Sequence, residues 1–153
     1  MNDIKYKNEN YNFAYRVSAI IYSPDETKIL LFYGNDMTFY MLPGGILKER
    51  EKSEDAIKRE IYEELGFKNL EFTFAGVCEE LISKRDCYIQ EITLTYKCKY
   101  IGSIEEHSFK SKESDWINFK WVEINKLGEY NIHPSKISLI VNNNCNHVIE
   151  ENF

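Results

Sequence analysis

Apolar residues follow two different periods along the chain, and these periods predict strands in one region and a helix in another. Residues 11–22 and 28–33 are rich in apolar and β-forming residues and flank a Ser-Pro-Asp turn, which predicts a hairpin. Between residues 53 and 65 the apolar positions recur at a helical spacing. Ser53 is placed to cap the start of this helix, and Gly66 to end it in a left-handed conformation.

The remaining segments predict a second group of strands and two later helices. The further strands cover residues 38–42, 70–78, 87–101 and 116–122, and helices are expected to begin near Glu123 and at Pro134. The first ten residues are polar and predict a flexible N-terminal arm. The order of strands, helix, strands and helix predicts one layered α/β domain over residues 11–153, with helices covering a mixed sheet.

Composition narrows the classes of partner. The chain has 153 residues, enough for one domain with a hydrophobic core, and a formal net charge of -6. This acidic balance argues against stable binding to nucleic acid or to an anionic membrane, because both need a basic footprint. The sequence has no apolar run of membrane-spanning length, no secretory signal and no paired cysteines of the metal-binding kind. We therefore expect a cytoplasmic protein without a membrane partner, and leave open whether it forms a homodimer.

The predicted helix carries an arc of like charge. At about 100° per residue, Glu60, Glu63 and Glu64 fall on one arc beside the apolar stripe that should pack on the sheet. Taken alone, this arc is a solvated face softened by ion pairs such as Arg59 with Glu63. Because the acids border buried residues and Glu51 precedes them, the alternative is a set of oxygen ligands for Mg²⁺ or Mn²⁺. The chemistry of such a site is metal-assisted attack of water on phosphorus.

One long motif resembles the signature of the Nudix hydrolases, of the MutT type. The signature runs Gly, five residues, Glu, seven residues, Arg-Glu-aliphatic, one residue, Glu-Glu, one residue, Gly and an aliphatic residue. Here it is filled by Gly45, Glu51, Arg59-Glu60-Ile61, Glu63-Glu64 and Gly66-Phe67, with an aromatic at the last position. The segments RVSAIIYSPDETKILLF, MLPGG and FKWVEINKL also look similar to the family, so the resemblance covers about residues 17–140.

The resemblance implies an α/β/α sandwich with a mixed central β-sheet. It also implies metal-dependent hydrolysis of a pyrophosphate bond in a nucleoside diphosphate linked to another moiety X, with Mg²⁺ or Mn²⁺ as cofactor. By position, the metal ligands would be Glu60, Glu63 and Glu64, and Glu60 or Glu64 would take a proton from water. Arg59 would orient these glutamates, and Glu51 would support the loop or the metal shell.

Residues outside the helix complete the implied site. Family members often supply a further acid from a later loop, and Glu113 is preferred to Glu105 and Glu106 because it directly precedes a predicted strand. The substrate-binding candidates are Gly44 and Gly45, which allow close backbone approach, Arg16 as a phosphate contact, and Tyr40 as a ring that could stack a base.

The sequence is less informative about the substrate. Family members that hydrolyse ADP-ribose or dinucleoside polyphosphates tend to carry a proline or tyrosine soon after the motif, and residues 68–99 contain no proline. A nucleoside triphosphate, including an oxidised or non-standard one, is then the default substrate. The alternatives are an ADP-ribose or dinucleoside polyphosphate hydrolase, and a catalytically silent Nudix-like module that senses a nucleotide. Such a module usually lacks a motif glutamate, and none is missing here.

Overall fold

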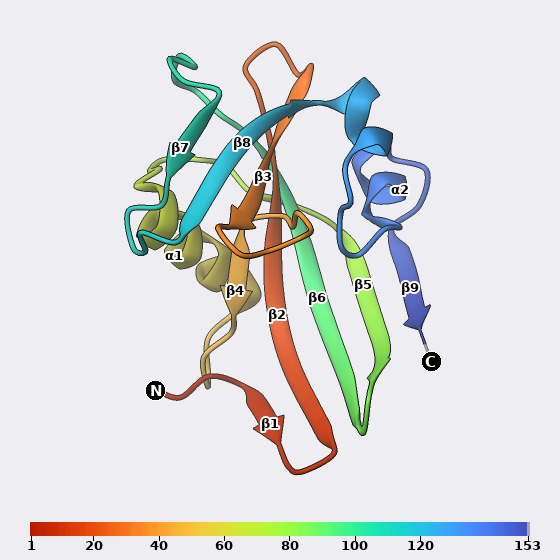
Figure 1. Cartoon of the computed structure of the whole chain (residues 1–153). Coiled ribbons are helices and arrows are strands. Elements are labelled where there is room, and N and C mark those ends of the chain that lie inside the picture. The colour runs from red at the N-terminus through yellow and green to blue at the C-terminus, as the bar shows by residue number, and fades with distance from the viewer. Residues whose placement is uncertain (153) are drawn as a thin grey trace.

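A mixed β-sheet organises the fold. In the computed structural model, which describes residues 1–152, the strands follow the order β7-β8-β3-β2-β6-β5-β9, with β1 and β4 attached to β2 (Figure 1). The strands are β1 (Lys5–Lys7), β2 (Tyr11–Tyr22), β3 (Lys28–Gly34), β4 (Gly44–Ile46), β5 (Thr73–Lys84), β6 (Cys87–Lys99), β7 (Ser108–Lys110), β8 (Ile117–Glu123) and β9 (His147–Asn152). The helices are α1 (Ser53–Leu65), the 3-10 helix η1 (Ile124–Glu129) and α2 (Ile137–Val141). β2 runs parallel to β6 and β5 parallel to β9, whereas the other pairs are antiparallel.

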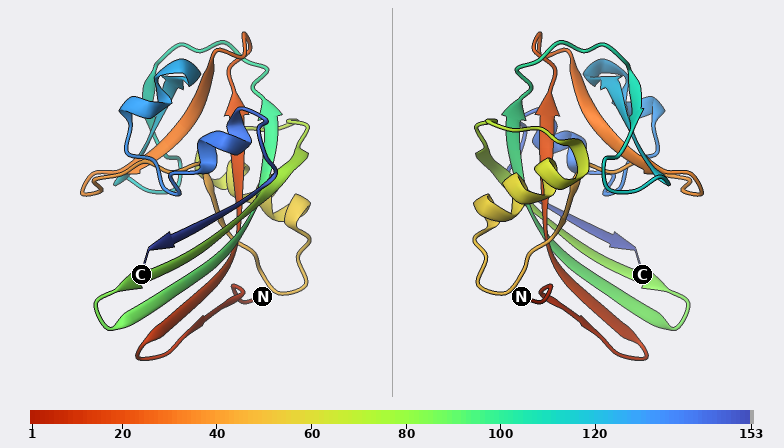
Figure 2. Two further views of the ribbon diagram at one scale, coloured as in Figure 1. Left: turned by 90° about the vertical axis from the view of Figure 1, so that its right-hand side faces the viewer. Right: turned by 90° about the vertical axis from the view of Figure 1, so that its left-hand side faces the viewer.

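The side chains of the sheet alternate between two apolar layers. On β2, Val17, Ala19 and Ile21 are buried in the layer under α1, while Ile20 is buried in the layer under α2 and η1. Figure 2 shows α1 and α2 on opposite faces of the sheet. The predicted α/β/α sandwich with a mixed central sheet is therefore confirmed.

The helix α1 begins one residue before the predicted start and ends at the predicted Leu65. Its apolar stripe is buried against the sheet, and Gly66 ends it with φ of 71° while its N–H donates to the carbonyl of Tyr62. The predicted capping role of Ser53 is wrong. Ser53 is the first helical residue, Lys52 holds the cap position without a side-chain capping bond, and the Ser53 hydroxyl lies 2.7 Å from that of Tyr96. Ser53 thus joins α1 to β6.

The N-terminal half differs from the sequence prediction in two further places. Residues 1–10, predicted as a flexible arm, contain β1, which pairs antiparallel with β2. Residues 38–42 form no continuous strand, and only Tyr40 and Met41 make isolated bridges. The Gly-rich turn that follows is in fact extended as β4, which pairs with β2. Local sequence does not reveal these pairings because each depends on a partner distant in the chain.

The C-terminal half also differs in detail. The polar segment after residue 102 contains the short strand β7. α2 begins at Ile137 instead of Pro134, and the asparagine-rich tail continues into β9, which the sequence did not predict. Within residues 1–152, none of the helices combines the length and the apolar character needed to cross a membrane.

Candidate active site

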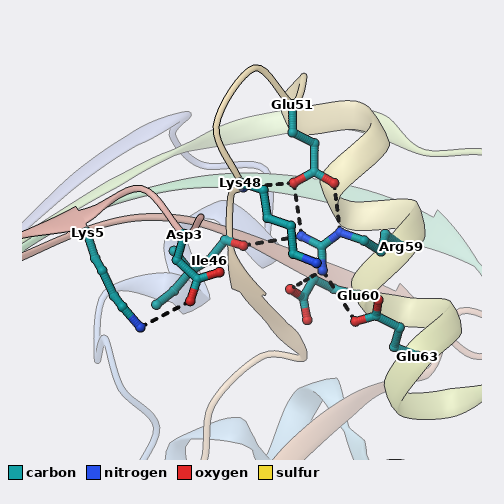
Figure 3. A network of polar contacts seen from close by, with 8 residues as sticks. All are labelled: Asp3, Lys5, Ile46, Lys48, Glu51, Arg59, Glu60 and Glu63. Carbon is teal, nitrogen blue, oxygen red and sulfur yellow. Dashed lines mark hydrogen bonds and ion pairs between the residues drawn. The ribbon is translucent and has the colours of Figure 1, made fainter. Parts of the chain in front are cut away.

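Arg59 lies at the centre of an ion-pair network beside α1 (Figure 3). Its Nε and Nη2 donate to the two carboxylate oxygens of Glu51, at 2.7 and 2.9 Å, in a bidentate pair. Its Nη1 donates to Glu60 at 2.7 Å and to Glu63 at 3.3 Å, and its Nη2 also reaches the carbonyl of Ile46. The hydrogen bonds from Arg59 lower the pKa of Glu51. The network thereby ties the loop after β4 to α1 and orients two of the motif glutamates.

Glu64 is buried, unlike Glu60 and Glu63. The residue is 8% exposed, and its Oε2 atom has no hydrogen-bond partner among the described residues. Burial raises the pKa of Glu64 to about 8, with repulsion from Glu60 and Glu113 in the same direction and attraction to Arg16 opposing it. Burial also raises the pKa of Glu60, although Arg59 opposes that shift. A buried carboxyl group with an unpaired oxygen is costly unless it is protonated or meets a cation.

The loop between β7 and β8 brings a fourth acid to this helix. The carbonyl of Glu64 accepts hydrogen bonds from the Lys112 N–H at 2.8 Å and the buried Ser111 hydroxyl at 3.2 Å. The Ser111 hydroxyl in turn accepts the N–H of Glu113 at 3.1 Å. Glu113 is consequently near enough to raise the pKa of both Glu60 and Glu64. Ser111 escaped the sequence reasoning, because a serine in a polar loop carries no signal of burial.

The other acids of that region lie elsewhere. Glu105 and Glu106 line a separate surface hollow together with Phe67 and Tyr100. The geometry therefore favours Glu113 among the three loop acids that the sequence offers.

Gly44 and Gly45 bring β4 close to its neighbours. A Cβ atom on Gly45 would overlap the carboxylate of Glu60, whereas one on Gly44 would overlap the backbone of Val17 and Ser18. Neither glycine has a positive φ, so each position requires glycine because a side chain would not fit there, and not because of the backbone conformation. Gly45 leaves room for the carboxylate of Glu60, and Gly44 allows β4 to pair with β2.

These two glycines predict separable effects of alanine. Gly45→Ala should displace the Glu60 carboxylate and lower kcat about 100-fold, because displacements near 1 Å can cost that much, with little change in melting temperature. Gly44→Ala should instead lower the melting temperature, since its clash is with backbone. Steady-state kinetics and thermal unfolding of both variants test this. Wild-type kcat in Gly45→Ala would mean that Glu60 does not need this space.

The donor set fits a hard divalent cation such as Mg²⁺ or Mn²⁺. All candidate donors are carboxylate oxygens, one buried oxygen of Glu64 is unpartnered, and Gly45 leaves space beside Glu60. Within residues 1–152, no three acidic, histidine or cysteine side chains already surround a common point. In Figure 3, Arg59 holds the carboxylates of Glu60 and Glu63.

The two substrate contacts predicted outside the motif differ in their surroundings. Arg16 lines a narrow cleft on the α2 side of the sheet, together with Glu80, which the sequence reasoning did not select. The ring of Tyr40 packs against those of Tyr33 and Tyr130, with centroids 5.3 and 5.2 Å away, and does not line this cleft. Glu80 escaped notice because it lies beyond the predicted strand 70–78, whereas β5 continues to Lys84.

The sandwich and the carboxylates gathered beside a Gly-Gly strand define a hydrolase of the Nudix class. A family model described as the NUDIX domain matches residues 12–141, and the chain belongs to this family. It is therefore a pyrophosphohydrolase that acts on a nucleoside diphosphate linked to another moiety. A comparison with curated protein sequences finds no match.

Solved structures of three bacterial proteins are similar in fold. The E. coli dihydroneopterin triphosphate pyrophosphohydrolase has a TM-score of 0.68 and 14% identity, covering 88% of this chain and 97% of that one. The MutT protein of Bacillus halodurans has a TM-score of 0.65 and 17% identity, covering 88% and 85%. A MutT structure from a study of Aliivibrio salmonicida and Vibrio cholerae has a TM-score of 0.57 and 19% identity, covering 87% and 99%. At these identities the likeness supports the fold and leaves the substrate to the site.

Proposed function

We propose that the protein hydrolyses a pyrophosphate bond of a nucleoside triphosphate, including an oxidised or otherwise non-standard one, with Mg²⁺ or Mn²⁺. The observation that carries the proposal is the buried, unpartnered oxygen of Glu64 within a complete motif. An uncompensated buried acid is costly for a structural helix, whereas a cation-binding helix has a use for it. The formal net charge of -6 favours a small nucleotide over nucleic acid as the substrate.

The residues take separate roles in this mechanism. Glu60, Glu63 and Glu64 would hold the ion, which supplies Lewis-acid polarisation of the phosphoryl oxygens when bound. Arg59, fixed by Glu51, keeps two of these carboxylates in position.

The same glutamates and two nearby charged residues account for the remaining steps. Glu60 or Glu64 would take the proton of the attacking water as the general base. Glu113 adds a further carboxylate beside them, and the positive charge of Arg16 acts on Glu64 from β2.

The test is a substrate panel. We expect purified protein with Mg²⁺ to release phosphate or pyrophosphate from at least one nucleoside triphosphate, with 8-oxo-dGTP among those assayed, and to release none in EDTA. ADP-ribose, NADH and diadenosine polyphosphates complete the panel, and faster turnover of one of these would assign the protein to the alternative hydrolase subclasses. Absence of turnover with every compound would contradict catalysis and favour a sensing module.

A further inference from the structure

A narrow cleft on the α2 side of the sheet contains a second buried acid without a partner. Glu80 on β5 is only 7% exposed, lines this cleft, and makes no side-chain hydrogen bond among the described residues. Arg16 of β2 and Thr93 of β6 form the adjoining floor, and Met41 and His133 approach from loops. Unlike Oε2 of Glu64, the oxygens of Glu80 are not sealed from solvent, so this carboxylate in the cleft wall is available to a ligand.

The neighbours of Glu80 are acids that already have partners. Strand register places Glu91 of β6 and Glu150 of β9 directly beside it in one row. Glu91 lies 3.9 Å from Nε of Arg16, and Glu150 accepts hydrogen bonds from Ser135. Burial raises the pKa of Glu80 to about 7, with Glu91 and Glu150 adding to the shift and Arg16 opposing it. Of the three adjacent glutamates, Glu80 is the one without a partner. Hydrogen-bond donors on a ligand would supply that partner and stabilise the ionised carboxylate.

Arg16 connects this cleft to the carboxylates of α1. Its charge opposes the raised pKa of Glu64 and of Glu80, so it lies near both. The strand register also pairs Arg16 with Ile46 of β4, next to Gly45. A substrate with its phosphates beside Glu64 can therefore extend its ring past Arg16 towards Glu80.

We propose that Glu80 and Arg16 select a fused ring with an amino-oxopyrimidine edge, as guanine and pterins carry; this rests on the proposed function. The edge presents a carbonyl oxygen, a ring N–H and an exocyclic amino group in a row. The Glu80 carboxylate accepts the two adjacent N–H donors, and the Arg16 guanidinium donates to the carbonyl oxygen. Adenine would instead direct a ring-nitrogen lone pair at Glu80 and leave the buried carboxylate unsatisfied.

The size of the cleft adds one requirement. Its free volume is about 20 Å³, close to the space of one water molecule, and a fused ring is larger. Entry of the ring therefore requires the side chains of Met41 and His133, which lie in loops and not in the sheet floor, to rotate outward. The floor residues Arg16, Thr93 and Glu80 lie on paired strands and stay in place.

Binding of monophosphates separates recognition from hydrolysis, because these compounds have no phosphoric anhydride to cleave. The intact protein, in buffer that contains Mg²⁺, is titrated in a calorimeter with GMP, IMP, AMP or neopterin monophosphate. IMP lacks only the amino group, so GMP should bind about 10- to 100-fold more tightly than IMP, and AMP should bind most weakly. Glu80→Gln should remove the preference for GMP over IMP. Glu79→Gln is the matched control, since it makes the same change on the opposite face of β5.

The outcomes distinguish this inference from the proposed function. Preferential binding of GMP or of neopterin monophosphate supports the inference. The compound that binds more tightly shows whether the cleft selects a guanine or a pterin ring. Equal binding of GMP, IMP and AMP overturns it, as does a Glu80→Gln variant that keeps the wild-type preference. Hydrolysis without this base preference would overturn the inference alone, whereas the base preference without any hydrolysis would overturn only the proposed function.

Discussion

Glu63→Gln is expected to reduce kcat by several orders of magnitude, about 1,000-fold, while the protein remains folded. The substitution keeps the shape of the side chain but replaces a charged oxygen donor with a neutral amide, which is a poor ligand for a hard cation. Its structural cost should be small, because the side chain is 39% exposed and its one ion pair, to Arg59, is 3.3 Å long. Glu60 and Glu64 are less exposed, so a loss of activity there would be harder to separate from misfolding.

The control for this prediction lies on the same helix. Glu54→Gln makes the same chemical change at an exposed position whose partner is Lys58, away from the carboxylate cluster. We expect it to keep wild-type kcat and melting temperature. Turnover of Glu63→Gln close to that of Glu54→Gln would remove Glu63 from the ligand set.

The metal-free protein is expected to lose stability as the pH rises from about 5 to about 8. Glu64 has a folded-state pKa of about 8 against an ordinary value of 4.5, so the folded state retains a proton that the unfolded chain releases. The stabilisation linked to this proton is present at low pH and is lost as pH rises through the folded pKa. The full shift corresponds to a loss on the order of 5 kcal/mol. Glu80, with a pKa of about 7, adds a change of the same sign.

Urea unfolding at about pH 5.5 and pH 8.5 measures this effect. In EDTA the free energy of unfolding should be lower at the higher pH, and saturating Mg²⁺ should reduce the difference because the cation stabilises the ionised carboxylates. Glu64→Gln should flatten most of the pH dependence, leaving the contribution of Glu80. The same pH dependence in Glu64→Gln as in the wild type would show that Glu64 is not its source.

Sequence spacing alone predicted the helix and its acidic arc, because a local period determines which residues share a face. The end of α1 at Leu65 follows from that period, and the left-handed Gly66 follows from the tolerance of glycine for this conformation. The roles of Ser53, Ser111 and Glu80 could not be predicted in this way. Each depends on a partner or a cleft formed by segments far apart in the chain, and an isolated polar residue carries no trace of that environment.

The two hydrogen bonds to the carbonyl of Glu64 make the candidate site discontinuous in sequence. The last turn of α1 contains no basic residue to offset the negative end of the helix dipole, and the loop donors at Ser111 and Lys112 satisfy its exposed carbonyl instead. A graft of residues 45–67 alone into another scaffold would lose these donors together with Glu113. Transplanting the activity would therefore require the loop at residues 111–113 as a second insert, held at the same position relative to the helix end.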